Sequence, residues 1–190
     1  MNPIETINFY LALGTLAMQI AAIAFLALYF LRRQFPDLED IARFLSEWGL
    51  WIGFVLTLGA SAMTLYYSEI LGIPPCPLCW WQRIFLYPQV MLFALALWGR
   101  DSRIALYSIA LSILGALFAL YHHVLQMAPA GTLPCPADGT VSCAQIFFLE
   151  FGYITYPMMA LSLFGFLIVL MIFVRSPRQD TLLTYSKEPA

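Results

Sequence analysis

Five long apolar stretches limit what this chain of 190 residues can fold into. They cover residues 7–31, 48–71, 80–99, 104–126 and 153–174. At ~1.5 Å of rise per residue, a helix over each stretch can cross a hydrocarbon core of about 30 Å. Hydrophobic residues make up 62% of the chain and charged residues 11%, which excludes an ordinary soluble domain. Backbone groups in lipid must pair within their own segment, so we expect an all-α integral membrane protein with five transmembrane helices.

The basic residues are distributed unevenly around these five spans. Eight fall on one side: Arg32, Arg33, Arg43, Arg100, Arg103, Arg175, Arg178 and Lys187. Only Arg83 falls on the other side. The positive-inside rule then predicts an outer N-terminus, a cytoplasmic C-terminus, and cysteine-bearing loops 72–79 and 127–152 on the outer, oxidising side. The chain has no basic face of the kind that nucleic acid requires.

Shorter segments connect and flank the spans. The inner connection 32–47 predicts a short amphipathic helix at the membrane surface, with Leu38, Ile41, Phe44 and Leu45 in one stripe. In the second outer loop, residues 144–151 mix aromatic and polar side chains and predict a short interfacial helix. The polar tail 176–190 is expected to be disordered in the cytoplasm. The first stretch is too long for a signal sequence, so we expect it to be retained as a span.

The run Cys76-Pro-Leu-Cys79 stands where the third apolar stretch begins. Proline prefers the first helical position, so Cys76 is expected at the N-cap and Cys79 in the first turn. There the unpaired amides and the helix dipole stabilise a thiolate. Arg83 follows Cys79 by four residues on the same helix face, where a cation lowers a thiol pKa further. The alternative role for Arg83 is an anchor that extends its charge to the interface.

A second pair, Cys135 and Cys143, stands in the other outer loop. This pair could form a purely structural disulfide, or all four cysteines could bind zinc. The long gap within the pair and the apolar membrane surface beside it weigh against zinc, so no metal is expected. His122 and His123 lie at the outer end of the fourth stretch. Each could be an interfacial side chain with a polar tip, or a hydrogen-bond partner of a redox cofactor at the depth of Arg83.

Several motifs together resemble the bacterial disulfide-forming membrane oxidoreductases of the DsbB/BdbC family, most closely the BdbC branch. The residues that carry the resemblance are Cys76-Pro-Leu-Cys79-Trp-Trp-Gln-Arg83 followed by Tyr87-Pro88, Tyr121-His122 ahead of Leu125-Gln126, the pair Cys135 and Cys143, and Gly152-Tyr-Ile-Thr-Tyr-Pro157. The resemblance covers roughly residues 48–175. It implies a four-helix catalytic core over 48–175 in a bacterial cytoplasmic membrane, with residues 1–47 as an extra N-terminal span and linker.

The resemblance also implies a function. The family reoxidises an extracytoplasmic thioredoxin-fold thiol oxidase and passes the electrons to a membrane quinone, ubiquinone or menaquinone. By this resemblance, the partner attacks a Cys135–Cys143 disulfide, Cys143 exchanges with Cys76, and Cys79 faces the quinone. Arg83 would hold the quinone, and His122 is the approximate match to a family histidine that does the same.

Two alternatives remain open at this stage. One is a quinone reductase of the vitamin K epoxide reductase type, in which the Cys-x-x-Cys pair is expected on the last helix of the bundle. The other is a non-catalytic membrane protein, such as a transporter or assembly factor, with two structural disulfides. Substitution of a cysteine distinguishes the classes, because only an enzyme would lose quinone reduction.

Overall fold

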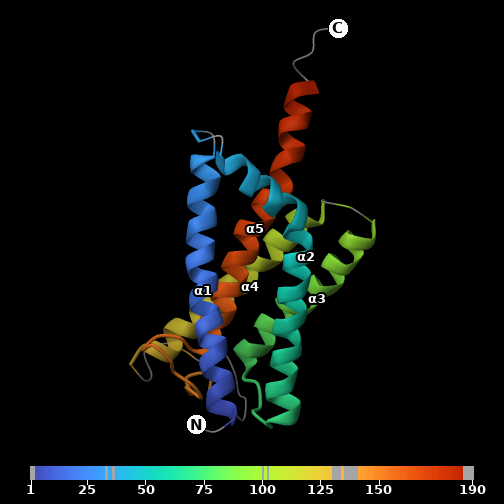
Figure 1. The fold of residues 1–190 in the computed structure, drawn as a ribbon. Helices are drawn as coiled ribbons and strands as arrows, with labels where there is room; N and C mark the ends of the chain where they lie inside the picture. Colours follow the sequence, from blue (N-terminus) through green and yellow to red (C-terminus); the bar gives the residue numbers. More distant parts are fainter. Residues whose placement is uncertain are drawn as a thin grey trace.

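The computed structural model describes residues 3–32, 34, 35, 37–99, 101, 103–129, 134 and 141–185. These residues form five long α-helices and one π-helical segment (Figure 1). The elements are α1 (Pro3–Leu31), α2 (Asp37–Leu65), η1 (Tyr66–Ile70), α3 (Pro77–Gly99), α4 (Ile104–Met127) and α5 (Tyr156–Tyr185). The all-helical class predicted from the apolar stretches is confirmed.

Four segments are long and apolar enough to cross a membrane: Ile4–Leu31, Leu38–Ile70, Ile104–Met127 and Tyr156–Arg175. Helix α3 coincides with the other predicted stretch but is not among the four. Its sequence contains Gln82, Arg83 and Gln89 together with three tryptophans, which lower its hydropathy. Arg83 and Gln89 are buried, so these polar groups face the protein rather than lipid.

Helix α5 lies at the centre of the molecule, with α1, α2 and α4 packed against it (Figure 1). Over half of its membrane segment is buried, a larger share than in any other candidate span. The fully buried side chains of Phe164, Leu167 and Leu170 form the middle of the largest apolar cluster. Most of its surface is covered by other helices and the rest lies in the apolar segment, so its sequence is apolar on all sides.

A glycine allows close packing of α4 against α5. A Cβ placed on Gly115 of α4 would lie 2.5 Å from the Phe164 ring, which is itself fully buried. Gly115→Ala is therefore expected to destabilise the fold by about 1–3 kcal/mol, the usual cost of overpacking. Gly165→Ala is the matched control, because nothing lies within 4 Å of its added Cβ. Thermal unfolding in detergent should show a lower Tm for the first variant only; equal Tm values would contradict this packing.

Hydrogen bonds between helices add to this packing. The Gln89 Oε1 atom of α3 accepts bonds from the hydroxyls of Ser108 at 2.7 Å and Ser112 at 3.3 Å on α4. All three side chains are buried. Within a membrane such bonds satisfy polar groups that lipid could not, so they fix the pairing of α3 with α4.

Hydrogen bonds at two positions along α1 attach this helix to η1, to α5 and to the segment just before α5. Near its start, Asn8 Oδ1 accepts hydrogen bonds from the hydroxyls of Tyr67 in η1 and Tyr156 in α5. About three turns further along α1, Gln19 donates to Ser162 Oγ at 2.8 Å and accepts from the Tyr153 hydroxyl at 2.7 Å. These contacts hold the extra N-terminal helix against the bundle in a defined register.

Two predictions for the end of the bundle remote from Cys79 differ from the structure. The connection is not a separate helix: from Asp37 onward it is continuous with the second span, and Leu45 is buried while Phe44 is exposed. The backbone hydrogen bonds of the helix continue where the sequence changes from amphipathic to apolar, because backbone groups in a membrane must stay paired. Helix α5 likewise continues past Arg175 to Tyr185, in the segment expected to be a disordered tail.

The predicted interfacial helix over residues 144–151 is wrong. The segment is irregular, and Glu150 pairs with Ile154 in an isolated antiparallel bridge around a turn in which Phe151 and Gly152 have φ of 51° and 78°. The irregular path lets Phe148 pack with Ala12 of α1 and Ile154 in a small buried cluster. Tertiary packing of one aromatic ring outweighs the local helical pattern here.

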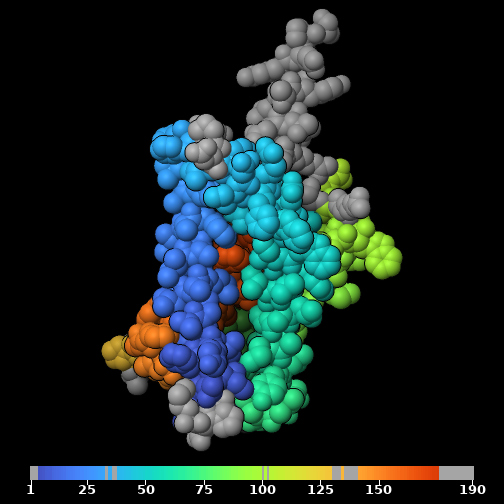
Figure 2. All heavy atoms as spheres, viewed as in Figure 1, coloured from blue at the N-terminus to red at the C-terminus, as the bar shows by residue number. Residues whose placement is uncertain are grey.

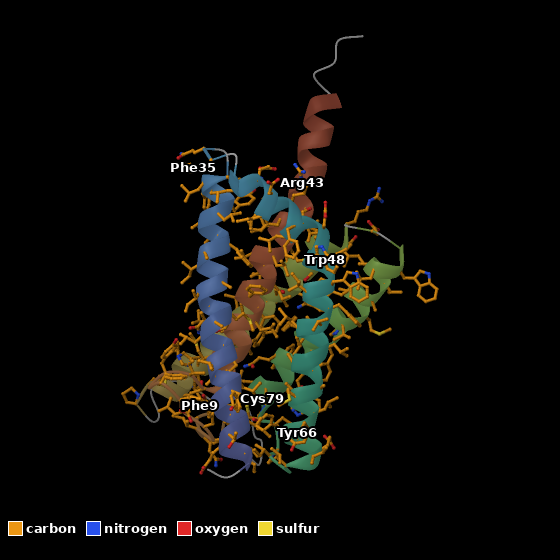
Figure 3. The ribbon with its side chains drawn as sticks, in the orientation of Figure 1. Phe9, Phe35, Arg43, Trp48, Tyr66 and Cys79 are labelled. Carbon is orange, nitrogen blue, oxygen red and sulfur yellow. The ribbon has the colours of Figure 1, made fainter. Side chains whose placement is uncertain are left out.

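Arg43 and Cys79 lie at opposite ends of the bundle, whereas Arg83 lies with the cysteines. Figure 3 shows Phe9, Tyr66 and Cys79 at one end and Phe35 and Arg43 at the other. The charge asymmetry in the sequence is therefore also an asymmetry of the folded molecule.

Candidate active site

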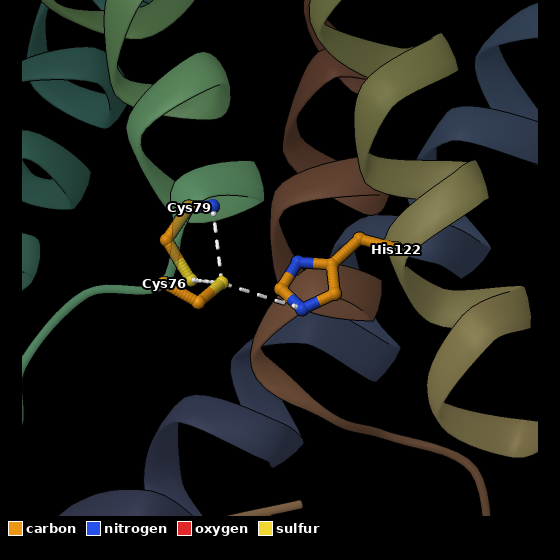
Figure 4. Close-up of side chains that lie close together, drawn as sticks. All are labelled: Cys76, Cys79 and His122. Carbon is orange, nitrogen blue, oxygen red and sulfur yellow. Dashed lines mark hydrogen bonds between the residues drawn. The ribbon is translucent and has the colours of Figure 1, made fainter. Parts of the chain in front are cut away.

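Cys76 and Cys79 form a close thiol pair at the start of α3 (Figure 4). Their Sγ atoms are 2.8 Å apart, and the helix begins at Pro77 as predicted. The Cys76 Sγ atom accepts a hydrogen bond from the Cys79 amide at 3.3 Å, and its carbonyl accepts from the Trp80 amide at 3.2 Å. Cys76 therefore caps the helix with its own sulfur, which orients it toward Cys79.

The proton of the reduced pair belongs to Cys76. Its hydrogen bond to Cys79, followed by burial, raises the pKa of the Cys76 thiol to about 12. Cys76 therefore stays protonated at neutral pH and donates to the Cys79 sulfur. Cys79 is left as the sulfur placed to bear negative charge, one helical turn from Arg83.

His122 lies between the two cysteine-bearing segments. Its imidazole is buried, with Nε2 3.7 Å from Cys76 Sγ and 3.1 Å from the carbonyl oxygen of Cys143 (Figure 4). The Gln82 amide lies 3.0 Å from Nδ1. With Gln82 donating to Nδ1, the Nε2 atom has the proton and donates to the Cys143 carbonyl. The sequence predicts a cofactor contact for His122; the structure places it next to Cys76 and in the lining of a cavity.

Two glutamines complete this arrangement, and neither was assigned a role from the sequence. Gln82 orients the imidazole of His122. Gln126 donates to the carbonyl of Gln145 at 3.1 Å and approaches that of Cys143 at 3.5 Å, which ties the second loop to α4. Helical spacing was the available signal: Gln82 follows Cys79 by three residues, and Gln126 follows His122 by four.

Cys143 belongs to the same buried cluster as Cys76. The two side chains pack with Leu78 and Leu125, and Cys143 is 1% exposed. The other member of the second pair, Cys135, lies outside the described residues. The structure thus brings together three of the four candidate cysteines, and His122 contacts both Cys76 and the carbonyl of Cys143.

Arg83 is buried beside Cys79 with its charge held by a carbonyl and an aromatic ring. Its Nη2 donates to the Thr64 carbonyl at 2.7 Å, and its Cζ lies 5.3 Å from the centre of the Trp80 ring. Among the described residues no carboxylate forms an ion pair with it. At 8% exposure it does not extend into solvent, so the geometry favours a role inside the protein over the anchor alternative.

A cavity of about 740 Å³ opens beside these groups. Cys76, Cys79, Arg83 and His122 line its polar end. Apolar side chains of α1, α2, α3 and α5 line the rest, among them Leu56, Leu86, Leu163 and Phe164. The volume lies within the usual range for small-molecule sites, and a few convergent polar groups in an apolar cavity are typical of them.

The side chains of Cys76, Cys79 and His122 are also spaced as metal ligands would be, because their ligand atoms lie within 4.8 Å of one another. Two sulfurs bound to one tetrahedral zinc at ~2.3 Å are about 3.8 Å apart. The 2.8 Å separation here is well below that, which favours a dithiol that closes to a disulfide over a chelating pair.

Known proteins resemble the chain over this same region. The family model for disulfide bond formation protein DsbB matches residues 46–174. Probable disulfide formation protein C 1 of Bacillus anthracis is 41% identical over 61% of this chain and 79% of its own length. Disulfide bond formation protein C of Bacillus subtilis (strain 168) is 34% identical over 69% of this chain and 95% of its own length. A probable disulfide formation protein of Coxiella burnetii (strain Dugway 5J108-111) is 34% identical over 64% and 83%. No solved structure matches the chain.

The matched segment contains both cysteine pairs, Arg83 and His122, and it begins after α1. It agrees with the resemblance read from the motifs, and not with the vitamin K epoxide reductase alternative. The family model covers more than half of the 190 residues. The chain belongs to the DsbB family, and it is a membrane oxidoreductase of disulfide bond formation.

Proposed function

We propose that the protein oxidises the dithiol of an extracytoplasmic thioredoxin-fold oxidase and delivers the electrons to a membrane quinone. The observation that supports this best is the position of the Cys76–Cys79 pair. Cys76 and Cys79 both pack in the cluster that contains Cys143, and both line the cavity together with Arg83. A dithiol in this position can exchange with a protein thiol and also reach a lipid-soluble oxidant.

The thiol exchange begins at the second pair. A thiolate of the partner attacks Cys135 in a Cys135–Cys143 disulfide and releases Cys143. The Cys143 thiolate attacks Cys76 Sγ, which breaks the Cys76–Cys79 bond and leaves the charge on Cys79. The second partner thiolate then attacks the partner sulfur that is bound to Cys135, which completes the partner's disulfide and releases the Cys135 thiolate. Cys135 attacks Cys143 in the Cys76–Cys143 bond, which re-forms the Cys135–Cys143 disulfide and releases Cys76. Two electrons have then moved from the partner to Cys76 and Cys79.

The site residues favour this direction of exchange. Cys76 is the sulfur that is attacked, and its pKa of about 12 makes it a poor attacker once reduced. Cys79 leaves as the sulfur that shares a face with Arg83. We propose that the Nε2 proton of His122 holds the Cys143 backbone beside Cys76, because it faces both groups.

The residues at the polar end of the cavity fit a quinone. Arg83 offers a buried guanidinium that is not neutralised by a described carboxylate, and such a group donates to carbonyl oxygens and stabilises developing negative charge. His122 also lines the cavity and would be a second donor. A bound ubiquinone or menaquinone would supply the oxidant, taking up two electrons and two protons for each Cys76–Cys79 disulfide that forms.

The proposed topology has five spans. Helix α3 runs between α2 and α4, which are both candidate spans, and packs against each of them. We therefore propose that α3 also crosses, with the N-terminus and both cysteine loops on the outer side of a bacterial cytoplasmic membrane. Arg43 stands at the end remote from Cys79, in agreement with the positive-inside rule (Figure 3).

A reconstituted assay tests this function. Purified protein in detergent or nanodiscs, a reduced thioredoxin-fold protein and ubiquinone or menaquinone are expected to consume one quinone for each partner dithiol oxidised. Quinone absorbance and the partner's free thiols measure the two quantities, with the partner plus quinone alone as the control. No quinone consumption above that control would refute the proposal. Labelling of Cys135 by an impermeant thiol reagent only in inverted vesicles would overturn the orientation.

A further inference from the structure

The cavity beside the active site extends far beyond its polar end. Near Cys79 and Arg83 it is polar. Most of its lining comes from apolar residues of α1, α2 and α5 that lie further from the cysteine end of the bundle. Met18 of α1 and Leu56 of α2 line its remote part. From Pro3 to Met18 is ~22 Å along a helix, so the cavity reaches deep into the membrane layer. A compact ring at Arg83 would leave this apolar part unfilled.

The wall of the cavity is incomplete between α1 and α2. Helix α1 packs chiefly against α5 and has only sparse contact with α2. Figure 2 shows a hollow between these two helices, with atoms of α5 and α3 at its back. The opening faces sideways, toward where lipid surrounds a membrane protein.

A glycine stands on each side of this opening. Gly14 of α1 and Gly59 of α2 both line the cavity and are both exposed. Nothing lies within 4 Å of a Cβ placed on either one. Gly14 is ~17 Å along α1 from Pro3, and Gly59 is at a similar distance from the end of η1 at Ile70, so both lie near mid-membrane depth.

Helix α1 forms part of the cavity wall but does not belong to the family core. The family match begins at residue 46, so α1 lies outside it. Asn8 and Gln19 hold the helix by hydrogen bonds at two levels, and the cavity-lining residues Leu11, Thr15 and Met18 lie between or beside those levels. The helix is fixed to α5 and leaves its α2 side open.

We infer that the opening between α1 and α2 is the path by which a polyprenyl quinone enters sideways from the bilayer, with its apolar tail lying between Gly14 and Gly59. This rests on the proposed function. The head reaches Arg83 and Cys79, and the tail leaves through the gap because lipid is as favourable for it as the protein interior. Helix α1 thus forms one side of the entrance that the family core alone would lack.

Leucine at either glycine tests the path, because it fills the gap without meeting a neighbouring atom at its Cβ. Quenching of intrinsic tryptophan fluorescence, with Trp80 next to Arg83, measures the Kd for quinone directly. For a polyprenyl quinone, Gly14→Leu and Gly59→Leu are each expected to raise the Kd and lower kcat/KM on the order of tenfold, because the leucine side chain occupies the space of the quinone tail. For a tailless quinone, which fits within the cavity, both variants should match the wild type.

Gly165→Leu is the control, since Gly165 is also free of neighbours but does not line the cavity. It should bind both quinones as the wild type does. Unchanged binding of the polyprenyl quinone in both glycine variants would overturn the path; a lipid that fills the gap would give this result. An equal loss for both quinones would overturn it too, because the tail would then not be what is blocked. If the wild type neither binds nor reduces quinone, the proposed function itself fails.

Discussion

The Cys79→Ser variant is expected to reduce quinone at least about a thousandfold more slowly than the wild type, because a hydroxyl cannot replace the thiolate that forms the disulfide. Cys79 lines the cavity and shares the Cys76 proton in the reduced pair. Without it, Cys76 has no disulfide for Cys143 to attack. The rate of quinone absorbance loss with a reduced thioredoxin-fold partner is the measurement.

The same variant should retain one half of the chemistry. The Cys135–Cys143 pair is intact, so a single equivalent of partner dithiol should still be oxidised with no quinone consumed. This stoichiometry separates a redox role from misfolding. In a protein with only structural disulfides, Cys79→Ser would instead lower the Tm and leave no catalytic activity to lose. Quinone turnover that survives in Cys79→Ser or Cys76→Ser would refute the central role of the pair.

The Arg83→Met variant is expected to raise the KM for quinone on the order of 10- to 100-fold, the usual value of a hydrogen bond from a charged donor. The KM for the thiol partner should not change, because the partner is proposed to react at Cys135. Methionine keeps most of the volume and removes a buried charge, so the fold should tolerate it. Steady-state kinetics with each substrate varied in turn measure the two constants.

Arg103→Met is the matched control, because Arg103 is exposed at the start of α4, far from the cavity in the fold. It should leave both KM values at the wild-type level. If Arg83→Met also left the quinone KM unchanged, Arg83 would be an interfacial anchor, as the alternative from the sequence held. Its burial and its bond to the Thr64 carbonyl argue against that result.

Much of the site could be predicted because its parts are local. Proline after Cys76 predicts where α3 begins, and helical spacing places Cys79 and Arg83 on one face. Local rules failed at residues 144–151, where the sequence pattern suits a helix but Phe148 packs against Ala12, more than a hundred positions away. They also gave Gln82 and Gln126 no role, because Gln82 meets an imidazole on another helix and Gln126 meets carbonyls of the second loop.

The sequence by itself determined the helical class, the start of α3 and the separation of Cys79 from Arg43. Those features follow from backbone pairing in lipid, from the proline at the start of α3 and from charge, which act within each segment. Only the tertiary structure decided that His122 lies against Cys76, that Cys143 is buried with it, and that α1 stands apart from α2 beside an open cavity. These depend on how separate helices pack and which polar groups pair across them, and no single segment encodes that.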